Sequence, residues 1–152
     1  MKPDEAASIV LKSYWDYSLP VNPVEIAEKL GLKVYMSDEL GRLGGYYDQQ
    51  EKEITINEND ALSRQRFSVA HEIGHCVLGH GSSPRDNQAA YNQQNYSKKE
   101  FQANIFAAEL LMPKDAMQVM VEIRGMKLAT LCETFGVSEE AMTIRLRSLG
   151  YV

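Results

Sequence analysis

The chain begins with apolar residues spaced as on one face of a helix. This pattern predicts an amphipathic first helix over residues 3–17. Its apolar positions are Ala6, Val10, Tyr14 and Tyr17. A second, shorter helix is predicted over residues 24–30. Asn22 followed by Pro23 is typical of a helix start, and Gly31 is typical of a helix end.

An alternating pattern of apolar and polar residues follows this second helix. Residues 32–36, LKVYM, alternate as in a β-strand. After a pair of glycines, the segments YYD and EITIN flank the polar stretch 49–52, and Ile54 and Ile56 share one face of the second segment. We therefore predict a β-hairpin within a small antiparallel sheet that packs on the surrounding helices.

Helical spacing returns in the second half of the chain. Residues 63–78 form one such pattern, and Gly79 follows in a position that favours glycine. Residues 80–96 are rich in Ser, Asn, Gln, Gly and Pro, which predicts a long loop. Ser97 then opens a helix that is apolar almost all round and ends before Pro113, so we expect this helix in the core.

The C-terminal part has the shape of a helix-turn-helix. Two helical patterns within residues 114–152 are joined by the turn FGVS, in which Ser138 suits the N-cap of the second helix. A DNA-binding protein would place the first turn of that helix in the groove, but here the turn carries Glu139 and Glu140. We therefore expect a packing or substrate-docking subdomain, appended to an α+β domain formed by residues 1–113.

Composition narrows the class of protein. The chain has 152 residues, of which 44% are hydrophobic and 24% charged, as expected for a folded domain. Its start does not resemble a signal peptide, and its two cysteines, Cys76 and Cys132, lack a CxxC spacing. We therefore expect a cytoplasmic protein with no membrane association and no disulfide. The net charge of -5 would repel a phosphate backbone, which disfavours nucleic acid as a partner.

The segment HEIGH is an HExxH motif inside the third predicted helix. Residues four apart share a helical face, so His71 and His75 can present two imidazoles to one zinc ion. The small residue Gly74 permits another element to pack closely on this helix. Glu72 can reach a water molecule on that zinc, which predicts a general base that takes the water's proton and passes it to the leaving amine.

A catalytic zinc needs a third protein ligand and an open fourth position. The motif HExxHxxGxxH does not supply it, because this chain has Leu78 and Gly81 at the last two positions of that pattern. Glu100 and Glu109, on the apolar helix, are then the candidates. Asn104 lies one turn after Glu100 and can hydrogen-bond a ligand histidine, which favours Glu100 as the third ligand and Asn104 as its neighbour supporting that histidine.

Both glutamates also have ordinary structural explanations. Ser97 and Glu100 have the spacing of a capping box, and Glu109 suits a solvated or ion-paired side chain at a helix end. The third histidine, His80, follows Gly79. We assign it to a helix end favoured by the dipole and leave it outside the predicted metal site.

Other residues around the motif are assigned to packing or to solvent. Cys76 is expected to be a small buried apolar residue. Tyr46 and Tyr47 alternate across a strand, so one faces the core and the other a cleft, with packing as the expected role of each. Arg64 and Arg66, just before the motif, are expected to be solvated or salt-bridged.

Two long segments, RQRFSVAHEIGHCVLGH and EFQANIFAAELLMP, resemble those of the ImmA/IrrE metallo-endopeptidases. The similarity extends over PVNPVEIAEKLGLKV, GGYYDQQEKEITIN and FGVSEEAMTIRLRSLGYV. The resemblance implies a gluzincin-like α+β fold in which residues 1–113 form the zinc metallopeptidase domain. It also implies one catalytic zinc held by the two histidines and Glu100. The implied substrate is a helix-turn-helix repressor, whose cleavage derepresses genes of a prophage, a mobile element or a stress response.

Two alternatives from other functional classes also fit the sequence. In the first, zinc is structural and the C-terminal helices bind DNA or a partner protein. In the second, the protein is half of a toxin–antitoxin pair and acts by binding alone. Glu72 argues against the first, because a structural site has no use for a glutamate beside the water position and usually has four protein ligands. The sequence therefore favours a zinc endopeptidase.

Overall fold

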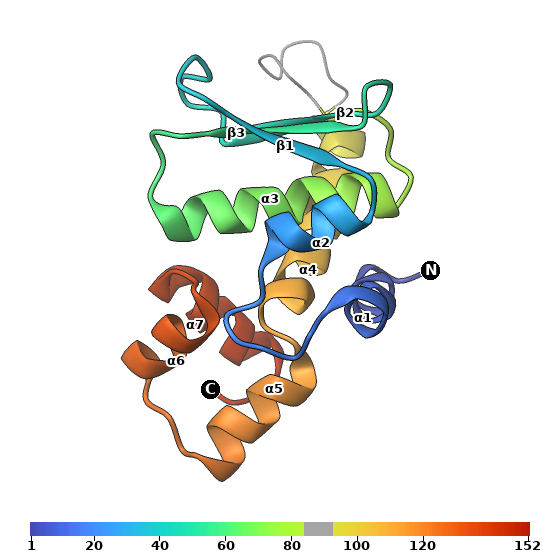
Figure 1. Ribbon diagram of the computed structural model, residues 1–152. Coiled ribbons are helices and arrows are strands. Elements are labelled where there is room, and N and C mark those ends of the chain that lie inside the picture. Colours follow the sequence, from blue (N-terminus) through green and yellow to red (C-terminus); the bar gives the residue numbers. More distant parts are fainter. Residues whose placement is uncertain (84–92) are drawn as a thin grey trace.

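The computed structural model describes residues 1–83 and 93–152, with side chains from residue 98 onward in the second range. In this part of the chain, a three-stranded sheet lies against a long helix, a second long helix crosses the first, and the other helices lie away from the sheet (Figure 1). This arrangement confirms the α+β class expected from the sequence. No helix of the described residues is both long and apolar enough to cross a membrane.

Two helices and three strands precede the HEIGH motif. They are α1 (Pro3–Tyr14), α2 (Pro23–Lys29), β1 (Lys33–Ser37), β2 (Gly45–Asp48) and β3 (Glu53–Asn57). The predicted cap of α2 is confirmed, because Asn22 Oδ1 accepts a hydrogen bond from the N–H of Glu25 at 3.1 Å. α1 ends before the predicted Tyr17, since the backbone is already extended at Trp15.

The sheet is mixed, with the strand order β1-β3-β2. β2 and β3 form the predicted antiparallel hairpin, with Tyr47 opposite Ile54. β1 instead runs parallel to β3, with Val34 opposite Ile54, so the prediction of an antiparallel sheet is wrong for this strand. The reason is topological. The chain reverses direction between β1 and β2, which are separated by the width of one strand. It reverses again after β2, and β3 occupies the position between them, so β3 is antiparallel to β2 and parallel to β1.

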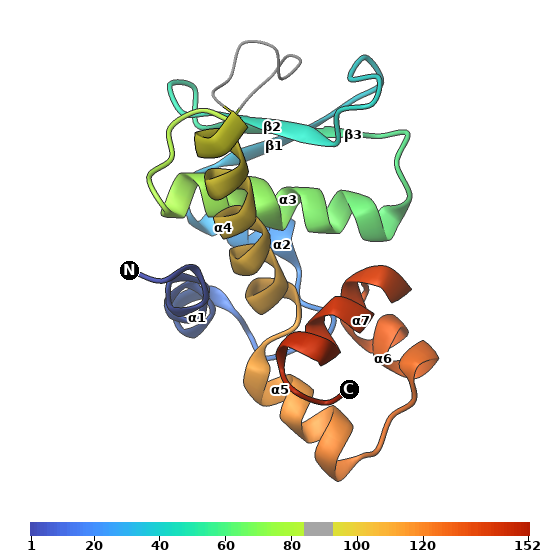
Figure 2. The same cartoon turned by 180° about the vertical axis from the view of Figure 1, so that it is seen from behind.

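Two long helices cross beneath the sheet. α3 (Leu62–Val77) lies along one face of the sheet, and α4 (Gln93–Leu111) crosses it (Figure 2). Gly74 permits this crossing as expected, because a Cβ atom at this position would lie only 3.1 Å from the ring of Phe106. Packed side chains from the sheet and these helices form the core, among them Ile54, Ile56, Ile73, Leu110 and Leu111.

α4 begins earlier than the sequence suggests. The predicted start at Ser97 is wrong, because the backbone is already helical from Gln93. Glutamine is a good helix former, so a polar run rich in this residue can be helical despite its loop-like composition. Ser97 is therefore inside the helix and not at its N-cap, and the capping-box explanation of Glu100 loses its basis. The rest of the predicted loop, residues 84–92, lies outside the described residues.

Shorter helices follow α4. They are α5 (Lys114–Gln118), the π-helical turn η2 (Val119–Ile123), α6 (Leu128–Phe135) and α7 (Glu139–Ser148). The predicted N-cap of α7 is confirmed, since Ser138 Oγ accepts a hydrogen bond from the N–H of Ala141 at 3.1 Å.

Two buried or partly buried arginines attach these C-terminal helices to the rest of the molecule. Arg145 of α7 lies 2.6 Å from Glu109 of α4, and its guanidinium also donates to the carbonyl of Met112. Arg66 of α3 donates to the carbonyls of Gly136 and Val21. The expectation that Arg66 is solvated or salt-bridged is therefore wrong, because backbone carbonyls from two distant segments converge on its guanidinium.

Candidate metal centre

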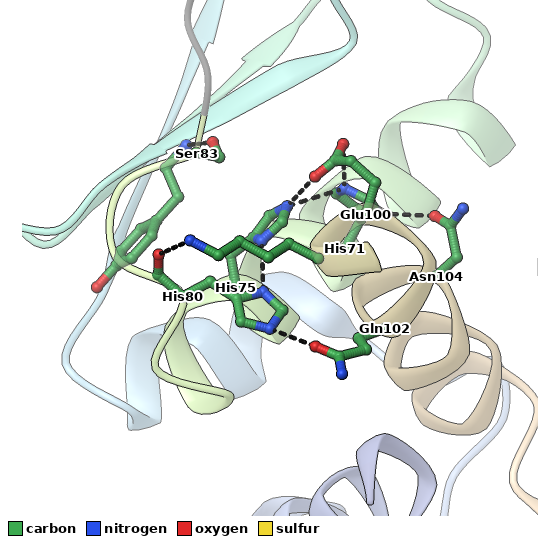
Figure 3. A network of polar contacts seen from close by, with 9 residues as sticks. His71, His75, His80, Ser83, Glu100, Gln102 and Asn104 are labelled. Carbon is green, nitrogen blue, oxygen red and sulfur yellow. Dashed lines mark hydrogen bonds and ion pairs between the residues drawn. The ribbon is translucent and has the colours of Figure 1, made fainter. Parts of the chain in front are cut away.

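The two histidines of the HEIGH motif and one glutamate of α4 meet where α3 and α4 cross. His71 Nε2 lies 3.2 Å from His75 Nε2 and 3.2 Å from Glu100 Oε1, and His75 Nε2 lies 2.5 Å from Glu100 Oε2. Figure 3 shows both imidazoles turned toward this carboxylate. Within the described residues, these three side chains could hold a metal ion, since their donor atoms all lie within 4.8 Å of one another. The other candidate, Glu109, instead pairs with Arg145.

The chemistry and spacing of these donors fit a zinc ion. Zinc is bound by imidazole nitrogen and carboxylate oxygen at about 2.0–2.2 Å, and tetrahedral geometry then keeps the donor atoms roughly 3.3 Å apart. The distances of 3.2 Å from His71 Nε2 to His75 Nε2 and to Glu100 Oε1 match this spacing, whereas the 2.5 Å between His75 Nε2 and Glu100 Oε2 is shorter. Three protein donors leave a fourth position for water or substrate, which is the arrangement of catalytic sites.

The other ring nitrogen of each candidate ligand also has a hydrogen-bond partner. His71 Nδ1 lies 2.8 Å from Asn104 Oδ1, so the structure places this asparagine against one of the two candidate ligand histidines. His75 Nδ1 lies 3.0 Å from His80 Nδ1, and His80 Nε2 lies 2.8 Å from Gln102 Oε1 (Figure 3). The sequence-based prediction left out His80 and Gln102. Partners of this kind fix ring orientation in metal sites.

The electrostatics of the centre favour an ionised carboxylate. Burial raises the pKa of Glu100, but the hydrogen bonds from His71 and His75 outweigh it and lower the pKa to about 2. Burial lowers the pKa of His71, but its hydrogen bond with Glu100 and the charge of Glu72 reverse this and raise the pKa overall. The carboxylates therefore draw positive charge to this point in the structure, and a bound cation would supply it.

Glu72 lies beside this centre without belonging to the donor group. It is only 4% exposed, and burial raises the pKa of its carboxyl against the opposing effects of His71, His75 and a hydrogen bond with Ser83. Among the described residues, its Oε1 has no hydrogen-bond partner. A buried acceptor without a partner is unusual in folded proteins, and a catalytic role is one of its recognised explanations. The position suits a general base that accepts a proton next to the metal.

The outer edge of β2 runs past the same region. The N–H of Tyr47 donates to Ser83 Oγ at 2.5 Å, and the N–H of Ser83 donates to the Tyr47 carbonyl at 2.9 Å. Tyr47 is buried, and this burial, together with a hydrogen bond to Cys76, raises the pKa of its hydroxyl. Tyr47 is therefore the tyrosine that faces the core, and packing is its role, as expected. Tyr46, its neighbour on the strand, is only partly buried.

Comparison with known families shows which family this chain belongs to. The model of the IrrE N-terminal-like domain, Peptidase_M78, matches residues 27–147. Because the match spans most of the chain, the protein belongs to this peptidase family. The resemblance to ImmA/IrrE proteins that the sequence suggested is therefore confirmed.

Individual relatives agree with this family. The chain is 33% identical over 112 residues to the radiation response metalloprotease IrrE of Deinococcus radiodurans, a match that covers 72% of this chain and 34% of that protein. It is 33% identical over 97 residues to the uncharacterized immunity region protein 2 of Bacillus phage phi105, covering 60% and 59%. It is 26% identical over 122 residues to the metallopeptidase ImmA of Bacillus subtilis, covering 78% and 72%.

The coverage of these matches differs in an informative way. The chain spans 34% of the length of IrrE and 59% of that of the phage protein, so both are longer than the region shared with this chain. Among solved structures, a Mycobacterium tuberculosis transcriptional regulator superimposes with a TM-score of 0.73 over 95% of this chain and 46% of that chain. Its sequence identity is 17%, so this similarity concerns the fold alone.

Proposed function

We propose that the protein is a zinc-dependent endopeptidase. One zinc is held by His71, His75 and Glu100, and Glu72 is the general base. The observation that supports this most strongly is the meeting of three donor groups from α3 and α4 beside the buried carboxylate of Glu72. Membership of a peptidase family and the names of two relatives, a metalloprotease and a metallopeptidase, support the same activity.

The residues of this chain divide the work of peptide hydrolysis. When bound, zinc polarises the peptide carbonyl and makes the attacking water more acidic. Glu72 accepts the proton that this water loses and delivers it to the nitrogen of the leaving amine. A carboxyl whose pKa is raised by burial is suited to both steps, since it holds a proton more readily than an exposed one. Asn104 keeps His71 oriented with its Nε2 toward the metal.

The substrate we propose is a helix-turn-helix repressor, cut at one peptide bond so that its target genes are derepressed. The resemblance to ImmA/IrrE proteins implies such a substrate, and one relative carries an immunity region in its name. We further propose a gluzincin-like metallopeptidase domain at residues 1–113 and a helix-turn-helix-like subdomain at residues 114–152 that docks the substrate. The α6–α7 pair, with its left-handed Gly136 and its cap at Ser138, supports the helix-turn-helix-like form of this subdomain.

Glu72→Gln tests this function directly. The variant should fold and bind zinc normally, because Glu72 is outside the donor group, yet its proteolysis should fall by a factor of about a hundred or more. The assay is co-expression with the helix-turn-helix repressor that the family resemblance predicts to be encoded nearby, carrying a tag at each end. We expect one cut and derepression with the wild-type protein, and neither with the variant.

The same assay separates the enzyme from a regulator that acts by binding. Full derepression by Glu72→Gln, with the repressor uncut, would show that binding alone regulates the genes. Proteolysis within a few-fold of wild type would instead remove Glu72 from the role of general base. Zinc content, measured on each purified variant, shows whether the metal centre is still intact in either case.

A further inference from the structure

The end of α3 folds the chain back over the HEIGH motif. Gly79 has a left-handed backbone (φ 71), the N–H of Gly79 donates to the Cys76 carbonyl at 3.2 Å, and the N–H of His80 donates to the His75 carbonyl at 3.0 Å. These two hydrogen bonds define a Schellman motif, in which the residue after the glycine meets the residue five positions earlier. The two residues that meet in this chain are His80 and His75.

The two rings face each other through their Nδ1 atoms. These atoms are 3.0 Å apart, and the ring centroids are 5.2 Å apart with an interplanar angle of 61°. A hydrogen bond between two ring nitrogens requires that one carries a proton and the other does not. His75 is 2% exposed, so the bond lies in a buried environment where an unsatisfied ring nitrogen would be costly.

The direction of this bond follows from the proposed metal site. His75 Nε2 faces Glu100 and must be free of its proton to act as a ligand, so the proton of His75 lies on Nδ1. His80 Nδ1 must then accept, and the proton of His80 lies on its Nε2. That nitrogen is 2.8 Å from Gln102 Oε1, an amide oxygen that accepts hydrogen bonds. Each hydrogen bond in this series, from His75 to His80 and from His80 to Gln102 of α4, therefore has one donor and one acceptor.

We propose that His80 is a positioning residue that fixes the tautomer and orientation of His75 as a zinc ligand, and that Gln102 fixes His80 in the same way. This inference rests on the proposed function, because it takes His75 as a ligand. It gives the two ligand histidines different partners: an amide for His71, and a second imidazole, itself oriented by an amide, for His75. A helix-end histidine that only interacts with the helix dipole would not need to accept a hydrogen bond at Nδ1 while donating another from Nε2.

Three substitutions at one position test the role of His80. His80→Ala removes the acceptor and should weaken zinc binding by about 10- to 100-fold, the usual cost of losing such a partner. His80→Asn should restore affinity to within about three-fold of wild type, because Asn Oδ1 stands as many bonds from Cα as Nδ1 does. His80→Gln should not restore it, since its oxygen lies one bond further out. The measurement is the zinc dissociation constant from competition with a chelator.

Gln102 provides an independent pair of variants that leaves both histidines in place. Gln102→Leu removes the acceptor for His80 Nε2 and should weaken zinc binding by a few-fold, whereas Gln102→Glu keeps an acceptor and should bind at least as tightly as wild type. Lys99→Ala is the matched control, because Lys99 donates to the backbone carbonyl of His80, at 3.4 Å, and not to its ring. This variant should leave the affinity unchanged.

The cobalt-substituted protein adds a spectroscopic readout of ligand geometry. Its visible absorption should change in His80→Ala and return in His80→Asn. Wild-type zinc affinity in both His80→Ala and Gln102→Leu would overturn the inference. So would equal losses in His80→Ala and His80→Asn with folding intact. A wild-type protein that binds no zinc would instead overturn the proposed function, so the two failures are distinguishable.

Discussion

α4 carries two glutamates, Glu100 and Glu109, whose partners differ in kind. Glu100, in the first half of the helix, faces the imidazoles of His71 and His75. Glu109, near its end, lies 2.6 Å from the guanidinium of Arg145. Imidazole can give up its proton and bind a metal, whereas guanidinium stays charged in proteins. The imidazoles around Glu100 can therefore exchange a proton for a metal cation, whereas Glu109 is held by an ion pair that stays charged.

Removing each glutamate in turn should show which of the two is needed to bind zinc. Purified wild-type protein should hold close to one zinc, and Glu100→Ala should lose it, because only the two imidazoles remain. Glu109→Ala should keep its zinc, since Glu109 pairs with Arg145 and not with the histidines. Metal analysis of the purified variants checks both. Zinc retained by Glu100→Ala but lost by Glu109→Ala would show that Glu109, and not Glu100, is the ligand.

The stability of the protein should depend instead on the ion pair between Glu109 and Arg145. Arg145→Ala leaves Glu109 as an uncompensated buried charge, and we expect a loss of about 3–5 kcal/mol in the free energy of unfolding, measured by urea denaturation. The double variant Glu109→Leu/Arg145→Met removes both charges and should recover most of that loss. A loss below about 1 kcal/mol in Arg145→Ala would show that this ion pair is solvated and weak.

A change where α3 and α4 cross should affect both stability and zinc binding. Gly74→Ala places a Cβ atom 3.1 Å from the ring of Phe106, and the two helices must separate to accommodate it. We expect a loss of about 1–3 kcal/mol in unfolding free energy and weaker zinc binding, because His75 and Glu100 lie on different helices. Ala116→Gly, in a short helix away from this crossing, is a control that should leave zinc affinity unchanged. Reduced stability with unchanged zinc affinity would show that the ligands adjust independently of helix spacing.

Local patterns in the sequence predicted the elements that build the site. The spacing of HEIGH places two histidines on one helical face, and the spacing of Glu100 and Asn104 places both on one face of α4, so their meeting with His71 needed only that the two helices cross. A signal for His80 was also present in the sequence. Glycine at the predicted helix end implies a Schellman motif, and this motif pairs the following residue with His75.

Features that depend on distant segments could not be predicted in this way. The parallel pairing of β1 depends on where β3 inserts, which no local pattern of β1 records. The partners of Arg66 come from Val21 and from the end of α6, so neither charge nor spacing near Arg66 could indicate them. The ion pair of Glu109 is similar, because its partner is in α7 and the sequence offered only an unspecified partner at a helix end.

The insertion of β3 between the other two strands also orders events during synthesis of the chain. Among the described residues, the hydrogen-bonded partner strand of β1 is β3, so β1 leaves the ribosome long before its partner does. The nascent sheet is completed only when Glu53–Asn57 emerges. α3, with both histidines of the motif, follows directly after this strand. The last strand of the sheet on which α3 packs is thus made just before that helix.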